Sequence, residues 1–244
     1  MTETNAREVR HRISRIVVLA ALAVGACTSA QPASNAPPTP LPRQPGCTTA
    51  ATNDSLCIVV LGDSIGQGVP STGDDRWWVR LRLLLTNALP GRHVTIDNWA
   101  VSGSRVDVLE SATRDQPEID TYAIAIIIEG VNDAATTPIE AWQPRYRAAV
   151  KELQARGVIP ILVTPPPSYE DGGFGTQYDA TAGAIRDVAA AGPWPLLDLA
   201  AQWRAAGPTI AGAYYVDLIH QSDAGQIVMA ALARDVVLEA VPRD

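Results

Sequence analysis

The chain has 244 residues, of which 47% are hydrophobic, so it can form one globular domain of ordinary size together with additional segments. It carries 19 Lys and Arg against 26 Asp and Glu, which gives a formal net charge of −7. This acidic balance, without a basic cluster in the part expected to fold, argues against binding of nucleic acid or of anionic lipid through positive charge.

The first 26 residues have the layout of a secretory signal peptide. Four arginines between positions 7 and 15 precede an apolar run at 16–26, about 11 residues long and too short to span a bilayer, for which about 20 are needed. The run ends in Val24-Gly25-Ala26-Cys27, which resembles the lipobox of bacterial lipoproteins. We therefore expect lipidation of Cys27 and attachment to the cell membrane on its outer side. The alternative is an ordinary signal peptide, a chance cysteine and a secreted protein.

Residues 27–55 are predicted to be a tether, and residues 56–244 the folded domain. Positions 28–46 consist mainly of Pro, Ser, Ala, Thr and Gln with almost no charge, a composition typical of flexible linkers. Removal of residues 1–26 takes away four Arg and two Glu, so the mature chain has 15 basic and 24 acidic residues and a net charge of −9.

The three cysteines fit an exported protein. Lipidation of Cys27 leaves Cys47 and Cys57, which an oxidising compartment would allow to form a disulfide. Two free thiols are the alternative. No spacing of Cys and His indicates a metal site.

The folded part alternates between buried strands and amphipathic helices. Strands are predicted at 56–61, 93–98, 122–128, 158–163 and 195–199, and helices at 76–89, 106–112, 138–156, 178–191 and 222–240. This alternation predicts an α/β fold with a parallel sheet covered by helices on both faces. The glycine-rich loop at 168–177, which carries Phe174, is either a flap over the site or an ordinary exposed loop.

Polar loops follow the first three predicted strands. Ser64 comes after the first, Ser102-Gly103-Ser104 after the second, and Gly130-Val131-Asn132-Asp133 after the third. Because the carboxyl ends of parallel strands lie along one edge of the sheet, we expect these loops to meet there. Ser64 would then be a nucleophile, with donors for the oxyanion of a tetrahedral intermediate on either side.

A general base for Ser64 must come from one of two histidines in residues 27–244. His93 begins a strand and therefore lies at the wrong edge of the sheet. His220 follows Asp217 by three residues, close enough for the carboxylate to bind Nδ1–H and leave Nε2 free to accept the serine proton. Taken alone, His220 could also be a residue that caps or packs on a helix.

Four sequence blocks in order resemble those of an SGNH hydrolase of the GDSL esterase/lipase family. They are Gly62-Asp63-Ser64, the segment 98–104, Gly130-Val131-Asn132-Asp133 and Asp217-Leu218-Ile219-His220, and the resemblance covers about residues 56–240. Ala100 departs from the glycine that many members have in the second block.

The resemblance implies a three-layer α/β/α sandwich with a five-stranded parallel flavodoxin-like sheet. It assigns Ser64, His220 and Asp217 to a catalytic triad, and Ser64, Gly103 and Asn132 to the oxyanion hole. It implies no cofactor and no metal. We expect a monomer.

The substrate is less constrained than the chemistry. The modest size of the domain favours a small-molecule or glycan ester, with short acyl groups on a sugar or on the cell envelope. A longer-chain lipase or thioesterase on the same triad, and a non-catalytic surface-anchored binding lipoprotein, remain alternatives. Gly62-Asp63-Ser64-Ile65-Gly66 also fits the G-x-S-x-G elbow of α/β-hydrolases, but that fold places several strands before the elbow.

Overall fold

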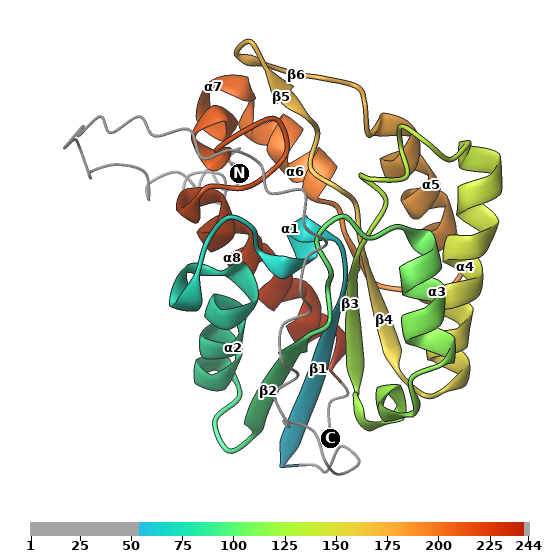
Figure 1. Ribbon diagram of the computed structural model, residues 1–244. Helices are drawn as coiled ribbons and strands as arrows, with labels where there is room; N and C mark the ends of the chain where they lie inside the picture. The colour runs from blue at the N-terminus through green and yellow to red at the C-terminus, as the bar shows by residue number, and fades with distance from the viewer. Residues whose placement is uncertain (1–53, 242–244) are drawn as a thin grey trace, which may run out of the picture. The chain divides into compact units, whose positions relative to one another are not determined.

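Five parallel strands form the central sheet of the computed structural model, which describes residues 54–241 (Figure 1). They are β1 (Ser55–Gly62), β2 (His93–Asn98), β3 (Ile124–Ile128), β4 (Ile159–Val163) and β7 (Leu196–Leu197). Their order across the sheet is β2-β1-β3-β4-β7, and every neighbouring pair is parallel. This is the flavodoxin-like order, so the predicted fold class and sheet are confirmed.

The strands form where the sequence is apolar and rich in β-branched residues. All five positions of β3 are buried, as are seven of the eight positions of β1. Such continuous burial requires cover on both faces of a parallel sheet. Because β1 lies between β2 and β3, its carboxyl end is flanked by the loops that follow both neighbours.

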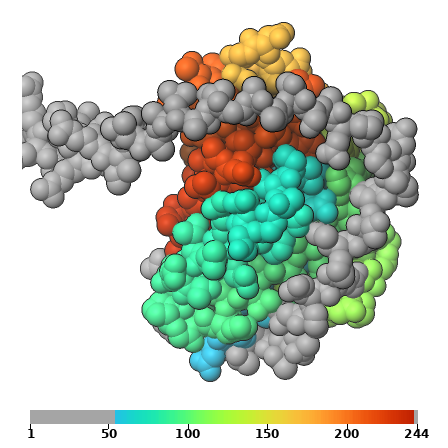
Figure 2. Space-filling view, turned by 60° about the vertical axis from the view of Figure 1, so that its left-hand side comes forward, coloured from blue at the N-terminus to red at the C-terminus, as the bar shows by residue number. Residues whose placement is uncertain are grey.

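Helices cover the two faces of the sheet (Figure 1). On one face lie α2 (Trp77–Ala88) and α8 (Asp223–Ala240), which contact each other side by side, as Figure 2 also shows. On the other lie α3 (Val106–Arg114), α4 (Ile139–Ala155) and α5 (Asp179–Ala190). Each face has its own buried hydrophobic cluster, so the sheet separates two cores. The five predicted helices are confirmed.

Several short elements were not predicted. They are α1 (Ser64–Gln67), α6 (Leu199–Ala206), α7 (Pro208–Ala211), the hairpin of β5 (Tyr169–Glu170) and β6 (Gly173–Phe174), and 3-10 turns at Gly73–Asp75, Pro117–Thr121 and Gly212–Tyr214. Except for α6, they are too short to show a period in the sequence. The hairpin occupies the loop predicted as either a flap or an exposed loop.

The predictions for the N-terminal segment lie outside residues 54–241, apart from the last two residues of the tether, of which Ser55 already belongs to β1. They concern the signal peptide, lipidation of Cys27 and the tether, and also the disulfide, because Cys47 is outside the described residues. Cys57, its expected partner, is buried in β1. Within the described range, no helix is both long enough and apolar enough to cross a membrane.

Candidate active site

Ser64 stands at the sharp turn where β1 ends and α1 begins. Gly62 has a φ of +130°, and a Cβ there would lie 1.7 Å from the carbonyl oxygen of Ile128, so only glycine lets the chain turn this close to β3. Asp63 caps α1 by accepting the amide of Ile65 at 2.9 Å. Ser64 is the first residue of α1, a position whose amide has no acceptor within the helix and can bind an anion.

A hydrogen-bonded chain joins Ser64 to His220 and Asp217. The Oγ of Ser64 lies 2.9 Å from Nε2 of His220, and Nδ1 of His220 lies 2.8 Å from Oδ2 of Asp217. The other carboxylate oxygen, Oδ1, accepts the amides of Ile219 at 2.9 Å and His220 at 2.8 Å. The three residues predicted as a triad therefore lie together, in the geometry of a nucleophile, a base and an orienting carboxylate.

The surroundings of Asp217 favour its ionised form. Partial burial would raise the pKa of this carboxyl, but hydrogen bonds from the amides of His220 and Ile219 and from the His220 ring outweigh it, and the pKa lies below its ordinary value. An ionised Asp217 keeps the Nδ1 proton of His220 on its own side of the ring. The Nε2 atom is then free to accept the proton of Ser64.

The loops predicted to supply oxyanion donors are tied to the end of β1. The carbonyl of Gly62 accepts the amide of Val101 at 2.8 Å and lies 2.8 Å from the hydroxyl of Ser104. The amide of Ser104 donates to Val101, which closes a turn with Gly103 at its third position and a φ of +80°. The side chain of Asn132 donates to the carbonyl of Ser104 at 2.9 Å. The structure thus brings both Gly103 and Asn132 to the edge that carries Ser64.

Asn98 holds the second loop against α1, a role that the sequence did not predict. Its side-chain amide donates to the carbonyl of Gly66 at 2.9 Å, and its Oδ1 accepts the amide of Ala100 at 2.9 Å. Ala100 is buried at the position where many family members have glycine, and its methyl group packs close to Gly66. Ala100 therefore fits at the position of the family's glycine, and Gly103 keeps its place in the turn.

Three buried carboxyl groups lie beneath the site, and none was predicted to have a role. Burial raises the pKa of Asp63 from 3.8 to about 7, although amide hydrogen bonds oppose the shift. Burial and the neighbouring Asp63 raise the pKa of Glu129 well above its ordinary value. Asp133 accepts the amide of Val106 at 3.0 Å and so fixes the start of α3. Sequence reasoning missed this cluster because its members look like ordinary loop residues.

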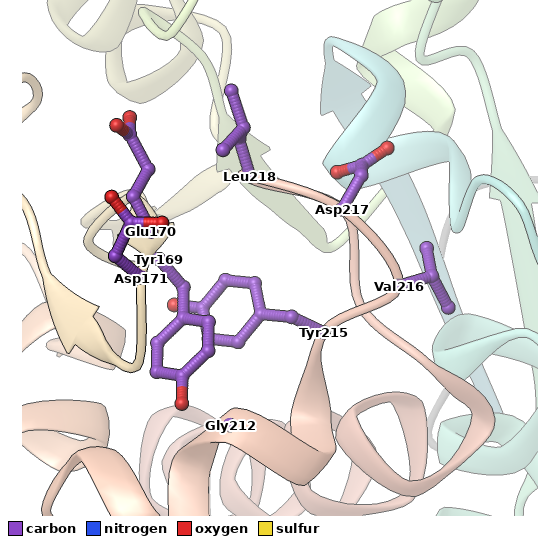
Figure 3. A pocket seen from close by; sticks show the side chains of 8 residues that line it. All are labelled: Tyr169, Glu170, Asp171, Gly212, Tyr215, Val216, Asp217 and Leu218. Carbon is purple, nitrogen blue, oxygen red and sulfur yellow. The ribbon is translucent and has the colours of Figure 1, made fainter.

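An open cleft of about 580 Å³ adjoins Asp217 on the side of the β5–β6 hairpin (Figure 3). Tyr169 and Tyr215 stack in it with their ring centroids 5.3 Å apart, and Tyr169 also donates its amide to the carbonyl of Leu218 at 2.8 Å. Glu170 and Asp171 project from the hairpin at its rim. The hairpin is thus packed against the segment that carries Asp217.

His93 is exposed at the first residue of β2, at the opposite edge of the sheet from Ser64. It is therefore remote from the triad, as predicted. Within residues 54–241, no group of three or more His, Cys, Asp or Glu side chains is arranged to hold a metal ion.

The family comparison agrees with this geometry. The model of the GDSL-like lipase/acylhydrolase family matches residues 60–227. The chain belongs to this family, and it is accordingly an ester-hydrolysing serine hydrolase. The predictions of the family and of an enzyme are confirmed, which sets aside a binding protein without activity. No curated protein matches the sequence.

Solved structures share the fold at low sequence identity. An acetyl xylan esterase is 20% identical with a TM-score of 0.63, over 77% of this chain and 100% of its own. A lipase/acylhydrolase from Enterococcus faecalis is 20% identical with a TM-score of 0.64, over 78% of this chain and 99% of its own. A two-domain esterase active on acetylated mannans is 19% identical with a TM-score of 0.63, over 78% of this chain and 50% of its own.

Proposed function

We propose that Ser64, His220 and Asp217 hydrolyse carboxylic esters through an acyl-enzyme, and that the natural substrates carry short acyl groups on a sugar or a cell-envelope glycan. The observation that carries the catalytic part is the continuous hydrogen-bonded chain from Ser64 Oγ through the His220 ring to Asp217, with contacts of 2.9 and 2.8 Å. This chain supports the proposal, because acyl transfer needs a nucleophile, a base and an orienting carboxylate in line before the substrate binds.

In the first half-reaction, Ser64 Oγ attacks the carbonyl carbon of the ester while Nε2 of His220 takes the hydroxyl proton. The oxygen of the tetrahedral intermediate becomes negative and accepts hydrogen bonds from the amides of Ser64 and Gly103 and the side chain of Asn132. Removal of one such donor costs about 3–4 kcal/mol of transition-state stabilisation in well-studied oxyanion holes. The bond to the alcohol oxygen then breaks, and His220 protonates the departing alcohol.

In the second half-reaction, His220 takes a proton from water, whose oxygen attacks the acyl carbon. The intermediate collapses, His220 returns the proton to Ser64 Oγ, and the carboxylic acid leaves. Asp217 stabilises the imidazolium that forms in both steps. No step draws on a metal or a cofactor.

The short-acyl, glycan part of the proposal draws support from the cleft beside Asp217. The carboxylates of Glu170 and Asp171 can accept hydrogen bonds from sugar hydroxyls, and the tyrosines offer flat apolar surface. Two of the enzymes with the same fold act, by their descriptions, on acetylated polysaccharides. A sugar ester could then bind with its acyl group at Ser64 and its sugar in the cleft.

One observation favours the alternative of longer acyl chains. Val216 and Leu218, on either side of Asp217, are 54% and 50% exposed and could contact an apolar chain. Rates on acetyl and octanoyl nitrophenyl esters separate the two substrate classes. We expect acetyl to be preferred, and a preference for octanoyl would replace the glycan proposal by the lipase one.

The catalytic proposal is tested by Ser64→Ala together with labelling by a fluorophosphonate. We expect loss of esterase turnover and of labelling in the variant, with an unchanged thermal unfolding temperature. Wild-type turnover in Ser64→Ala would refute the assignment. Ser222→Ala is the matched control, because Ser222 caps α8 near the site but has no part in the proposed chemistry.

We further propose that the mature chain begins at a lipidated Cys27 and holds the domain outside the cell membrane on the tether, with Cys47 and Cys57 joined. The sequence motif at 24–27 supports this proposal. The anchor is tested by partition of the full chain into a detergent phase. We expect the wild-type protein to enter that phase and Cys27→Ser to stay in the aqueous phase. Release of the wild-type protein into the medium would mean that it is secreted instead. Thiol alkylation before and after reduction tests the disulfide.

A further inference from the structure

Ser104 connects the two loops that carry the proposed oxyanion donors. Its carbonyl accepts the side-chain amide of Asn132 at 2.9 Å, and its peptide nitrogen follows directly after Gly103. Its hydroxyl oxygen lies 2.8 Å from the carbonyl oxygen of Gly62 and 2.9 Å from Oε2 of Glu129. The positions of Gly103 and Asn132 relative to the end of β1 therefore depend on how the Ser104 hydroxyl is held.

The two contacts of this hydroxyl require two hydrogens, and a serine hydroxyl has one. The Gly62 carbonyl can only accept, so the Ser104 hydrogen belongs on that contact. The contact with Oε2 then needs a hydrogen from Glu129. The other oxygen, Oε1, accepts the amide of Gly130 at 3.0 Å, which leaves Oε2 as the protonated atom.

Burial and two neighbouring carboxyls also favour a neutral Glu129, and together they outweigh the hydrogen-bond contacts with Ser104 and Gly130, which lower its pKa. Glu129 is 1% exposed and Ser104 is 4% exposed, so little water can stabilise a charge between them. The carboxyls of Asp63, at the start of α1, and Asp133, in the loop after β3, act on Glu129 and raise its pKa further. Tyr146, in α4, also interacts with Glu129, and burial raises the pKa of that tyrosine, so its hydroxyl stays neutral and brings no charge to the group.

We propose that Glu129 is a positioning residue of the oxyanion hole, and that it holds Ser104 by donating a hydrogen bond from a protonated Oε2. The proton stays on Glu129 throughout and is not transferred in the reaction. This inference rests on the proposed function, because the placement of Gly103 and Asn132 matters for rate only if they bind the oxyanion.

Two substitutions separate a neutral donor from an anion. Glu129→Gln offers an amide N–H to Ser104 and an oxygen to the Gly130 amide without a titratable proton, so kcat should stay within about twofold of wild type. Glu129→Met has a similar length but no donor. We expect its kcat to fall about tenfold with KM nearly unchanged, since oxyanion donors act mainly in the transition state.

A double-substitution cycle tests whether Glu129 acts through Ser104. Ser104→Ala should itself lower kcat, and adding Glu129→Met to it should cost less than twofold more, because both changes remove the same link. Independent, multiplicative losses would overturn the proposal. Equal losses of kcat in Glu129→Gln and Glu129→Met would also overturn it, because they would mean that the negative charge is needed. Wild-type kcat in both variants would overturn it as well.

A direct measurement does not depend on activity or on the folding of Glu129→Met. The infrared difference spectrum of wild type minus Glu129→Gln at neutral pH should contain the carbonyl band of a protonated carboxylic acid. A carboxylate band in its place would overturn the proposal. If Ser64→Ala kept its turnover, the proposed function would fail while this spectrum still reported the state of Glu129, so the two failures are distinguishable.

Discussion

Asp217 holds His220 by its ring and by its backbone at once. One carboxylate oxygen binds Nδ1 at 2.8 Å, and the other accepts the His220 amide at 2.8 Å. The residue that we propose selects the tautomer of the ring therefore also fixes the turn that brings the ring to Ser64. The spacing of three residues between acid and base makes this double contact possible within one turn.

Asp217→Asn should leave the turn in place but lower kcat about 10⁴-fold, the scale of the corresponding change in a serine protease. The asparagine oxygen can still accept the two amides, while its NH₂ group would face Nδ1 and favour the tautomer that carries its hydrogen on Nε2. Steady-state kinetics and thermal unfolding measure the two effects.

Asp235→Asn is the control for this change, because among residues 54–241 the exposed Asp235 forms an ion pair with its neighbour Arg234 on α8, away from the triad motif. It should leave kcat unchanged. If Asp217→Asn retained more than a tenth of the wild-type kcat, the carboxylate would not be the orienting group.

The proximity of Ser64, Asp217 and His220 could be predicted from the sequence, because these residues lie in short local motifs at positions that the topology fixes. Ser64 follows a strongly apolar strand, and parallel pairing forces the ends of β1, β2 and β3 to the same edge. Asp217 and His220 needed no long-range information about each other, since a single turn joins them.

The Glu129–Ser104 contact could not be predicted in this way. These residues are 25 positions apart, and their contact depends on side-chain conformations at the ends of two strands that flank β1. The cleft could not be predicted for a similar reason. Tyr169 and Tyr215 meet only when the hairpin folds back over the segment after α7.

Asp198 was placed in the wrong element. The prediction put it inside a strand at 195–199, whereas β7 ends at Leu197 and Asp198 caps α6. The apolar run around Asp198 is compatible with a strand that includes this residue and with a helix that begins after it. Since β7 pairs with only two residues of β4, the capping bond to the Ala201 amide decides where the strand ends.

Asp198→Ala should lower the free energy of unfolding by about 2–3 kcal/mol, because it removes a helix cap and charge-assisted hydrogen bonds at once. Asp198 accepts from Arg186 at 2.7 and 2.8 Å, from Thr164 at 2.9 Å and from the Ala201 amide at 3.1 Å. It thereby joins the end of β4 to α5 and α6. Urea unfolding at neutral pH gives the free energy.

Asp235→Ala serves as the comparison, since its pair with Arg234 is mostly exposed and should contribute less than about 0.5 kcal/mol. Equal losses of unfolding free energy in the two variants would show that Asp198 contributes no more to stability than a surface ion pair does.

Asp63→Asn should change how stability depends on pH. The pKa of Asp63 is raised from 3.8 to about 7, so the folded state keeps a proton that the unfolded chain releases above about pH 4. The contribution of Asp63 to stability is therefore present below pH 4, declines as the pH rises towards 7 and is constant above it. Between pH 5 and 8 this loss amounts to about 2–3 kcal/mol.

Urea unfolding of wild type and Asp63→Asn at pH 5 and pH 8 measures this difference. Asparagine can still accept the amide of Ile65 as a helix cap. We expect the variant to gain stability relative to wild type between the two pH values by about that amount. A constant difference would mean that Asp63 is ionised at both.

Tyr169→Ala should affect a sugar ester more than a small synthetic one. The Tyr169 ring stacks on Tyr215 at 5.3 Å and meets the Phe174 ring edge-on at 6.0 Å, so it forms a wall of the cleft and anchors the hairpin. If the sugar occupies the cleft, loss of the ring should raise KM for an acetylated xylo-oligosaccharide about three- to tenfold, since one aromatic contact contributes about 0.5–1.5 kcal/mol. Nitrophenyl acetate has no sugar to occupy the cleft, so its kcat/KM should stay within about twofold.

Tyr169→Phe is the matched control for this prediction, because it keeps the ring and removes only the hydroxyl that donates to the Pro208 carbonyl at 3.3 Å. It should behave as wild type on both esters. Equal losses on the two substrates in Tyr169→Ala would indicate that the hairpin supports the turn of Asp217 rather than the substrate. Unchanged kinetics on both would exclude the cleft as the sugar site, and the exposed Val216 and Leu218 would then make long acyl chains the better substrate hypothesis.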